Sequence, residues 1–325
     1  MIFKHSVIFA LSLNTILNYF DRKEGAPGAN GSLKPVSGVR HPGLSPFKSV
    51  DIMGVRFTDP QIQHLMEYGD EDWSKAEFED AAARDKEFSA NMSRLKSAND
   101  KGVREVIAHP SNDLADLENA IREKLKARGF IEVRTPIFVS KAALAKMTIT
   151  EDHPLYKQVF FIDDKRALRP MHAMNLYAVM RKLRDHTDGP VRIFEIGSCF
   201  RKESKSSTHL EEFTMLNLVE LGPDGDAMEH LKMYIGDVMD AVGVEYTTTR
   251  EESDVYVETL DVEIGGTEVA SGAIGPHRLD PAHDIHEPWA GVGFGLERLL
   301  MLKKSKSNVR KTGKSTTYVN GYKMD

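Results

Sequence analysis

The sequence predicts an α+β fold in which helices flank a largely antiparallel sheet. Its strand-like segments are short, closely spaced and linked by hairpin turns, and no regular crossover helices separate them, which is typical of an antiparallel sheet. Helical periodicity precedes these strands and ends at Gly129. The 325 residues, 41% hydrophobic and 28% charged, suit one large or two small globular domains and exclude a disordered or fibrous protein.

We expect residues 1–52 to be disordered. An apolar run at residues 7–13 follows Lys4 and His5 and resembles a signal-peptide core, although it is too short to span a bilayer. Residues 21–52 are rich in glycine and proline and cannot bury enough apolar surface to fold. We interpret Met53 as the natural start and the preceding residues as a mispredicted extension. The alternative is a targeting segment, and mass spectrometry of the endogenous amino terminus distinguishes the two.

Residues 53–105 are predicted to form a small helical segment. Thr58 and Asp59 can cap a short helix over residues 60–68. The sequence from Ser74 to Glu77 has the form of a capping box before a charged helix that runs to about Asn99.

Residues 106–325 are predicted to form the larger domain, which begins with a helix that buries one face. The apolar residues of this face recur at helical spacing: Leu114, Leu117, Ile121 and Leu125. Strands are expected at residues 130–136, 191–196, 213–220 and 260–264, the last joined by a Gly265-Gly266 turn to a strand over residues 267–271.

Two motifs about ninety residues apart predict a nucleotide site: Phe200-Arg201-Lys202-Glu203, and Gly-Val-Gly-Phe-Gly-Leu-Glu-Arg over residues 291–298. Alone, the first is usually a solvated strand end, and the second a turn or a closely packed strand. The glycines of the second motif, which include Gly293 and Gly295, alternate strictly, as on one face of a strand that lets a ligand approach its backbone. No βαβ unit surrounds them, so the dinucleotide-binding pattern does not apply.

These motifs resemble those of the class II aminoacyl-tRNA synthetases. Residues 129–136 look like the first motif, a helix and strand ending in proline at the dimer interface, while residues 200–203 and 291–298 look like the second and third. Longer runs, such as Ile193-Phe-Glu-Ile-Gly197, are similar to the pyrrolysyl-tRNA synthetase family. The resemblance covers roughly residues 53–325. It implies ATP and Mg²⁺ as cofactors, tRNA and pyrrolysine as partners, and a homodimer with residues 134–138 near its two-fold axis.

Amino-acid activation is an in-line attack of a carboxylate on the α-phosphorus of ATP, and it needs charge neutralisation and positioning more than a nucleophilic side chain. The resemblance places Arg201 at the α-phosphate and the substrate carboxylate, where a planar guanidinium can bind in bidentate fashion. It places Glu203 at the adenine amino group. Phe213 would stack on the purine ring, with Arg298 on the other side of the ring and near the γ-phosphate.

The resemblance implies further contacts with ATP and Mg²⁺. His209 and Leu210 would belong to the loop that closes over ATP, and Gly295 lies in the third motif beside it. Glu268 and Ser271 would hold Mg²⁺ through oxygen, the hard ligand that this ion prefers. The catalytic residues implied by the family are therefore Arg201, Glu203, Glu268 and Arg298.

The resemblance also implies an amino-acid pocket, whose residues are nearly all apolar or aromatic: Ala173, Leu176, Tyr177, Met180, Asn217, Val219, Tyr256, Ser271, Ala273, Trp289 and Gly293. A pocket for lysine or arginine needs a carboxylate, because a buried unpaired cation is very costly. None of these residues is acidic, so we expect a long side chain that ends in neutral bulk, such as an acylated lysine. Asn217 can orient an amide or the main-chain carbonyl, and Tyr256 can act as a lid.

Two residues depart from the family pattern at this pocket. His172 stands where leucine is usual, and Met174 stands where proline is usual. We expect the pocket to accept pyrrolysine but to tolerate a different set of analogues, because apolar pockets discriminate mainly by shape. Cys199 is expected to be a buried spectator, and the histidines at 283 and 286 are expected to lie in a loop whose spacing fits no standard zinc site.

The formal net charge of −6 disfavours unspecific binding to nucleic acid, yet basic residues gather near the C-terminus: Lys303, Lys304, Lys306, Arg310, Lys311 and Lys314. We expect residues 53–105 and this basic segment to contact tRNA, and the alternative for the basic segment is a solubilising tail. The single cysteine indicates a reducing compartment, so we expect a cytoplasmic protein with no membrane partner.

Three functions follow from this pattern. The first is a synthetase that charges pyrrolysine onto a tRNA with a CUA anticodon, which reads UAG. The second is a synthetase-like ligase that passes an adenylated amino acid to a non-tRNA acceptor, and the third is a catalytically silent tRNA-binding paralogue. The intact set of charged residues argues against the third. Charging of that tRNA with pyrrolysine, lysine and phenylalanine, compared side by side, distinguishes them.

Overall fold

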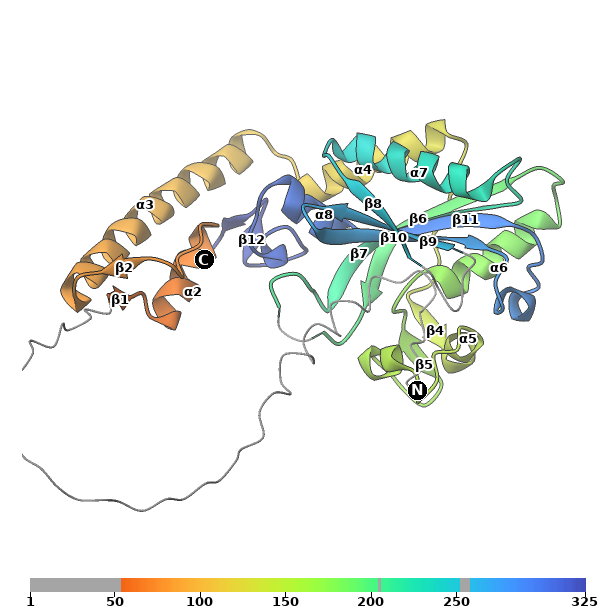
Figure 1. Ribbon diagram of the computed structural model, residues 1–325, viewed down its shortest axis with the longest axis horizontal. Helices are drawn as coiled ribbons and strands as arrows, with labels where there is room; N and C mark the ends of the chain where they lie inside the picture. Colours follow the sequence, from red (N-terminus) through yellow and green to blue (C-terminus); the bar gives the residue numbers. More distant parts are fainter. Residues whose placement is uncertain (1–53, 204–205, 252–257) are drawn as a thin grey trace, which may run out of the picture.

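The computed structural model describes residues 54–203, 206–251 and 258–325, and a seven-stranded sheet lies between helices in the larger part of the molecule (Figure 1). The expected extension at residues 1–52 and the expected lid residue Tyr256 lie outside the described residues. The β3–β6 pair is parallel and the other neighbouring strands of this sheet are antiparallel, which confirms the α+β class. The strand order is β3 (Ile131–Glu132), β6 (Val191–Phe200), β7 (Glu212–Leu221), β11 (Trp289–Gly295), β10 (Thr267–Gly275), β9 (Glu258–Ile264) and β8 (Thr247–Glu251).

Helices cover both faces of the sheet (Figure 1). Helices α4 (Asp113–Ala127) and α7 (Ala227–Val242) pack on one face, and α6 (Ala173–Arg184) packs on the other. The four apolar residues predicted for the buried face of α4 all lie in the core, so this helix is confirmed. Helix α8 (Leu296–Lys303) follows β11 directly, and the third motif therefore ends in the first turn of a helix.

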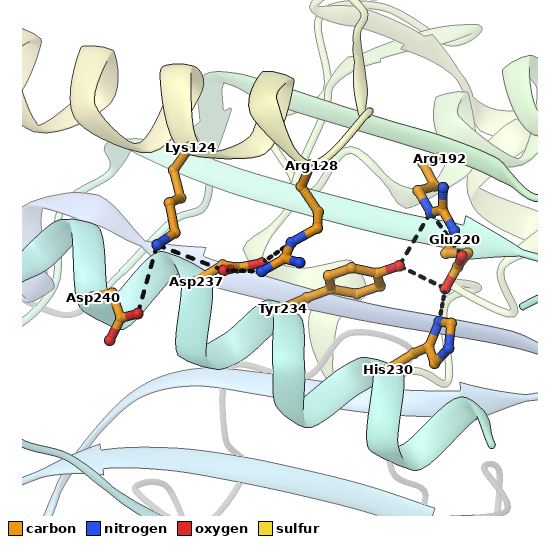
Figure 2. Close-up of polar contacts among 8 residues, drawn as sticks. All are labelled: Lys124, Arg128, Arg192, Glu220, His230, Tyr234, Asp237 and Asp240. Carbon is orange, nitrogen blue, oxygen red and sulfur yellow. Dashed lines mark hydrogen bonds and ion pairs between the residues drawn. The ribbon is translucent and has the colours of Figure 1, made fainter. Parts of the chain in front are cut away.

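Polar side chains join α4, α7 and the sheet on the face opposite α6 (Figure 2). The carboxylate of Asp237 in α7 accepts two hydrogen bonds from the guanidinium of Arg128, at 2.6 and 2.7 Å. Glu220 of β7 is fully buried. Three groups contact its carboxylate: Arg192 Nε at 2.8 Å, the Tyr234 hydroxyl at 2.8 Å and His230 Nδ1 at 2.6 Å.

Helix α2 (Asp59–Tyr68) begins as predicted. The side chain of Thr58 accepts a hydrogen bond from the backbone N–H of Gln61, while the Gln61 side chain accepts one from the backbone N–H of Thr58. This reciprocal pair is a capping box, and it satisfies two donors that a helix start leaves unpaired.

The second predicted helix starts and ends later than expected. Helix α3 spans Ala81–Ala108, and Asp80 caps it by accepting a hydrogen bond from the backbone N–H of Ala83. The capping box expected at residues 74–77 is wrong, because Glu77 lies in β2 (Glu77–Phe78), which pairs with β1 (Val55–Arg56). A strand partner distant in sequence overrides the local helix signal.

The C-terminal segment folds back on the N-terminal helical segment. Lys311 is buried, and its ammonium group donates to the carboxylate of Asp70 at 2.9 Å and to the carbonyl of Gly69 at 2.8 Å. Burial raises the pKa of Asp70, but hydrogen bonds from Ser307 and Lys311 outweigh burial and hold this pKa at about 2. The segment contains η3 (Val309–Lys311), β12 (Tyr318–Val319) and β13 (Tyr322–Lys323).

The sequence pattern does not reveal several elements. The chain between α4 and α6 contains β4 (Phe138–Ser140), α5 (Lys141–Lys146), η1 (Pro154–Gln158) and β5 (Arg166–Leu168). Strands β4 and β5 pair apart from the main sheet, and the short helix η2 (Asp280–His283) precedes β11. Within the described ranges, no helix is long and apolar enough to cross a membrane.

Candidate active site

Arg201 lies one residue past the end of β6, and neighbouring groups hold its guanidinium. Its Nε donates to the carbonyl of Pro170 at 3.0 Å, and its Cζ lies 5.3 Å from the ring centroid of Phe213. Burial lowers the pKa of Arg201, yet a guanidinium stays charged at neutral pH. A buried cation against an aromatic ring is suited to bind an anionic group such as a phosphate or a carboxylate.

Arg298 contacts two other residues that are predicted to bind ATP or its Mg²⁺, Glu268 and His209. It lies in the first turn of α8 and donates to the carbonyl of Glu268 at 3.0 Å and to Nε2 of His209 at 3.1 Å. Because a guanidinium only donates, Nε2 of His209 accepts and its Nδ1 carries the ring proton, facing two hydroxyls of the same loop at 3.0 Å. Burial and the charges of Arg298 and Arg201 lower the pKa of His209 to about 4, so this ring is neutral at pH 7.

Glu203 completes a charged cluster with these residues. Burial raises the pKa of Glu203, and the charges of Arg201 and Arg298 act in the opposite direction. Burial lowers the pKa of Arg298, and the charges of Glu268 and Glu203 oppose that change. The four residues that the family implies as catalytic therefore influence one another electrostatically at the meeting of β6, β10 and α8.

Glu268 and Ser271 lie on the same face of β10 although they are three residues apart. In a regular strand such residues point to opposite faces. A β-bulge lies between Glu268 and Ala270, and it shifts the alternation by one residue. On the adjacent strand β9, Glu268 pairs with Glu263 and Ser271 pairs with Asp261. These two partners are two residues apart and share a face, which places Glu268 and Ser271 on one face as well.

The oxygens of Glu268 and Ser271 fit a Mg²⁺ ion that a nucleotide brings with it. Among the described residues, no group of three or more His, Cys, Asp or Glu side chains could hold a metal. Mg²⁺ in nucleotide sites usually takes one or two carboxylates and completes its shell with phosphate oxygens and water. Two protein ligands are therefore enough when the phosphates supply others.

The pocket residues of the sheet lie in two rows that cross β7, β11 and β10. In the first row, Asn217 lies opposite Gly293, and Gly293 lies opposite Ser271. The second row lies two residues further along the strands and contains Val219, Gly291 and Ala273. Val219 and Ala273 pack in the core cluster that includes α6, so both rows lie on the face that α6 covers.

A small cavity lies between α6 and the sheet, and six predicted pocket residues enclose it: Ala173, Leu176, Tyr177, Met180, Val219 and Trp289. All six are buried, and none is acidic. The cavity measures about 10 Å³, which is room for about one water molecule. The side chains therefore nearly fill this space, and a larger group could enter only by displacing them.

Asp280 fixes two walls of this cavity, although sequence reasoning does not single it out. Its Oδ1 accepts a hydrogen bond from the Tyr177 hydroxyl at 2.8 Å, and its Oδ2 accepts one from Trp289 Nε1 at 2.8 Å. Oδ2 also accepts from the backbone N–H of His277 at 2.7 Å, and the ring of His283 stacks on Tyr177 at 4.2 Å. An aspartate followed by proline is an ordinary loop sequence, so no local signal reveals this role.

A buried ion pair between Arg169 and Glu195 fixes the chain segment that holds Arg201. Arg169 Nη1 donates to the carboxylate of Glu195 at 2.6 Å, and that carboxylate also accepts from the backbone N–H and the hydroxyl of Thr135, at 3.0 and 2.7 Å. These contacts fix the chain next to Pro170, whose carbonyl holds Arg201. Glu195 lies in a run that resembles the family, but residue type alone does not show that Glu195 and Arg169 position another arginine.

Leu210 and Cys199 complete the comparison with the expected site. Leu210 faces the C-terminal segment, where it lines a groove of about 720 Å³ together with Arg310 and Lys314. Cys199 is buried as expected, and burial raises its pKa to about 12, so it remains a thiol.

Three comparisons place this geometry among known proteins. Residues 97–319 match the family described as the tRNA synthetases class II core domain (F). The fold matches the crystal structure of a pyrrolysyl-tRNA synthetase from Desulfitobacterium hafniense with a TM-score of 0.79 and 42% sequence identity, over 83% of this chain and 98% of that chain.

Curated relatives share shorter regions. The threonine–tRNA ligase of Wolbachia pipientis is 36% identical over 98 residues, which are 29% of this chain and 15% of the ligase. The phenylalanine–tRNA ligase alpha subunit of Prochlorococcus marinus is 25% identical over 179 residues, which are 51% of this chain and 50% of the subunit. The chain thus spans between about one seventh and one half of the length of these relatives.

Proposed function

Because this chain belongs to the class II aminoacyl-tRNA synthetases, and among them to the pyrrolysyl-tRNA synthetases, we propose that it activates pyrrolysine with ATP and transfers it to the 3′ end of a tRNA with a CUA anticodon. One observation carries the proposal. The charged cluster around Arg201 and Arg298 and the apolar cavity of Tyr177 and Trp289 lie along the same sheet, and the row containing Asn217 lies next to the cavity wall at Val219.

The chain's own residues supply binding and charge neutralisation. Arg201 binds the α-phosphate and the substrate carboxylate, and its buried, fixed guanidinium holds the two reacting groups in line. Arg298, held by Glu268 and His209, neutralises the outer phosphates. When bound, Mg²⁺ neutralises further phosphate charge, and Glu268 and Ser271 would hold it. No nucleophilic side chain is needed, and Cys199 stays outside the reaction.

The cavity supports a neutral side chain as the substrate. Its six lining residues are apolar or aromatic, and an unpaired ammonium group would be very costly there. Asp280, the acid behind the wall, already accepts hydrogen bonds from Tyr177, Trp289 and His277. Free lysine therefore lacks a counter-charge in this cavity, whereas an acylated lysine does not need one.

The test compares pyrrolysine, lysine and phenylalanine in two assays. ATP–pyrophosphate exchange measures activation, and charging of the CUA tRNA measures transfer. We expect both signals with pyrrolysine and neither with lysine or phenylalanine. Activation of pyrrolysine without charged tRNA would support a ligase with another acceptor, and tRNA binding without exchange would support a silent paralogue.

We propose that tRNA binds where the N-terminal helical segment meets the C-terminal segment. The groove that contains Leu210 is lined by residues of both segments. Four of the six clustered basic residues already have acidic partners within the chain: Lys304 with Asp113, Lys306 and Lys311 with Asp70, and Lys314 with Glu212. Lys303 and Arg310 are exposed and have no ion pair with any described residue, so they carry the free positive charge.

The double substitution Lys303→Ala with Arg310→Ala tests this surface. We expect a higher KM for tRNA and unchanged ATP–pyrophosphate exchange. The slope of the logarithm of the tRNA binding constant against the logarithm of salt concentration should become shallower by roughly 0.7–0.9 for each phosphate contact that is lost. Lys304→Ala is the matched control, because Asp113 already neutralises Lys304 at 2.7 Å. Equal loss in both assays would count against a role in tRNA binding.

We further propose a homodimer through the chain from β3, the edge strand of the sheet, to the start of β4. Ile131 in β3 is 52% exposed, and Ile137 and Phe138, which lead into the separate β4–β5 pair, are also exposed. Exposed apolar groups at a sheet edge favour association with a second copy. Light scattering should show a shift from dimer to monomer for Phe138→Asp but not for Ile107→Asp, which changes an equally apolar exposed residue on α3.

A further inference from the structure

Two polar side chains between α6 and the sheet, His172 and Asn217, are fully buried and lack hydrogen-bond partners. Both ring nitrogens of His172 and both amide atoms of Asn217 are unpaired, and each residue is 0% exposed. A buried polar group without a partner costs about 1–3 kcal/mol, and native structures contain few of them. A bound ligand can supply partners for two of these four atoms, one ring nitrogen of His172 and the amide nitrogen of Asn217.

In the chain, these two residues are close neighbours of residues that line the apolar cavity. The residue after His172 and the residue two places after Asn217 both line it. Glycines on the neighbouring strands leave room for the two side chains. A Cβ atom at Gly293 would lie 2.7 Å from Asn217 Nδ2, and one at Gly197 would lie 3.5 Å from His172 Nε2.

The ring of His172 is neutral at pH 7. Burial and the nearby charge of Arg169 lower the pKa of His172 well below its usual value. The Asn217 side chain and the Gly197 backbone lie close enough to act in the opposite direction, although neither meets hydrogen-bond geometry with the ring. Arg169 itself is occupied, because it donates to Glu195 at 2.6 Å. A neutral imidazole offers one N–H donor and one nitrogen acceptor.

A neutral imidazole and a carboxamide together complement a secondary amide or a carbamate. The amide nitrogen of Asn217 can donate to the ligand carbonyl, and the free ring nitrogen of His172 can accept from the ligand N–H. An ester or a ketone of the same shape lacks that N–H and leaves the nitrogen of His172 unpaired. An ammonium group would find no anion in this pair.

We propose that His172 is a specificity-determining residue that accepts a hydrogen bond from the N–H of the substrate's side-chain amide, so that the enzyme selects amides and carbamates over isosteric esters and ketones. The proposal rests on the proposed function, because it assumes that the substrate is an acylated lysine. Leucine at this position, as the family pattern has it, could select by shape alone. His172 adds selection by chemical group.

The test measures kcat/KM in ATP–pyrophosphate exchange for three substrates: an Nε-acyl-lysine, its ester analogue with oxygen in place of the N–H, and its ketone analogue with CH₂ in that place. One hydrogen bond to a neutral group is worth about 1 kcal/mol, so we expect the wild-type enzyme to prefer the amide over the ester about fivefold or more. His172→Leu should bring this ratio close to one, and His172→Gln, whose side-chain oxygen can accept, should restore part of it.

Two controls separate this role from a structural one. His186→Leu changes an exposed histidine just beyond the end of α6 and should leave the amide-to-ester ratio unchanged. In the absence of ligand, His172→Leu should raise the midpoint of thermal unfolding, because it removes two unpaired buried nitrogens. A lower midpoint would show that His172 has a structural partner and would overturn the proposal.

The outcomes also distinguish this inference from the function on which it rests. Equal amide-to-ester ratios in the wild-type enzyme and in His172→Leu would overturn the role of His172 while leaving the activation of acylated lysines intact. If the wild-type enzyme activated none of the three compounds, the proposed function would fall, and this inference would fall with it.

Discussion

The carboxylate of Asp280 accepts a hydrogen bond from the hydroxyl of Tyr177 at 2.8 Å, and this bond fixes one wall of the apolar cavity from behind. The other oxygen of Asp280 bonds the indole of Trp289. One buried acid thus holds two walls, although Asp280 does not itself line the cavity. The shape of the cavity is therefore determined by a residue outside its lining.

Asp280→Asn should weaken amino-acid binding without affecting ATP. Asparagine has one acceptor oxygen where the carboxylate has two. Its NH₂ group would face the N–H groups of His277 and Trp289, which donate to Asp280 in the wild-type protein. We expect the KM for the amino acid to rise about tenfold, as for the loss of about 1.4 kcal/mol, with the KM for ATP unchanged. Asp284→Asn, an exposed neighbour of η2, is the control. A parallel rise in both constants would contradict a positioning role.

Arg201→Lys should reduce activation strongly. Lysine cannot reproduce the planar fork that bonds Pro170 and lies over Phe213 while binding an anion. Loss of one preorganised donor typically lowers kcat by about 10²–10³, and ATP–pyrophosphate exchange measures it. Arg94→Lys on α3, an exposed arginine paired with Glu71, should have no effect. Exchange within tenfold of wild type would exclude Arg201 from the reaction.

Glu297 makes stability depend on pH near neutrality. Burial raises its pKa to about 7 from 4.5, although the Thr214 N–H that bonds both its oxygens acts against this rise. The pKa of Glu297 is higher in the folded state than in the unfolded state. The protonated form of Glu297 therefore contributes fully to the free energy of unfolding below about pH 4.5, and this contribution is lost as the pH rises through about 7.

Glu297→Gln should therefore flatten the pH profile of stability. Between pH 5 and 8 the free energy of unfolding should fall by roughly 2–3 kcal/mol less in this variant than in the wild-type protein. Urea unfolding at several pH values measures the difference, and Glu123→Gln on the exposed surface of α4 is the control. Identical profiles for all three proteins would contradict the ionisation of Glu297 in this range.

Tyr234→Phe should lower stability without lowering activity. Its hydroxyl donates to Glu220 at 2.8 Å on the sheet face opposite the cavity (Figure 2). Removal of this bond inside the core should cost about 1–2 kcal/mol in urea unfolding, while ATP–pyrophosphate exchange stays at the wild-type rate. Tyr246→Phe, which changes an exposed tyrosine between α7 and β8, should change neither quantity. Lost exchange at unchanged stability would show that this network reaches the active site.

Much of this architecture could be predicted because its signals are local. Helical periodicity predicted α4, and the alternating glycines predicted that β11 is a strand. The pair Gly265-Gly266 predicted the turn between β9 and β10, where these residues have φ values of +58° and +78°. The family resemblance named six residues that do enclose one cavity. These features depend on residues close together in the sequence or on motifs with fixed spacing.

The remaining features depend on contacts between distant residues. The β-bulge that turns Glu268 to the face of Ser271 has no sequence signal, and regular alternation would have separated the two. Asp280 acquires its role only when β11 and α6 meet. Glu77 resembles a helix start until β1 pairs with it. Local patterns cannot contain such information, because the partner lies elsewhere in the chain.

The buried pair of Asp70 and Lys311 has a consequence for biosynthesis. The two residues are 241 positions apart, and ribosomes add roughly 5–20 residues per second. Synthesis of the chain from Asp70 to Lys311 therefore takes roughly 10–50 s. Throughout that interval the C-terminal segment that α2 and α3 contact has not been made. The proposed tRNA groove is therefore completed last, after the sheet and its pocket have been synthesised.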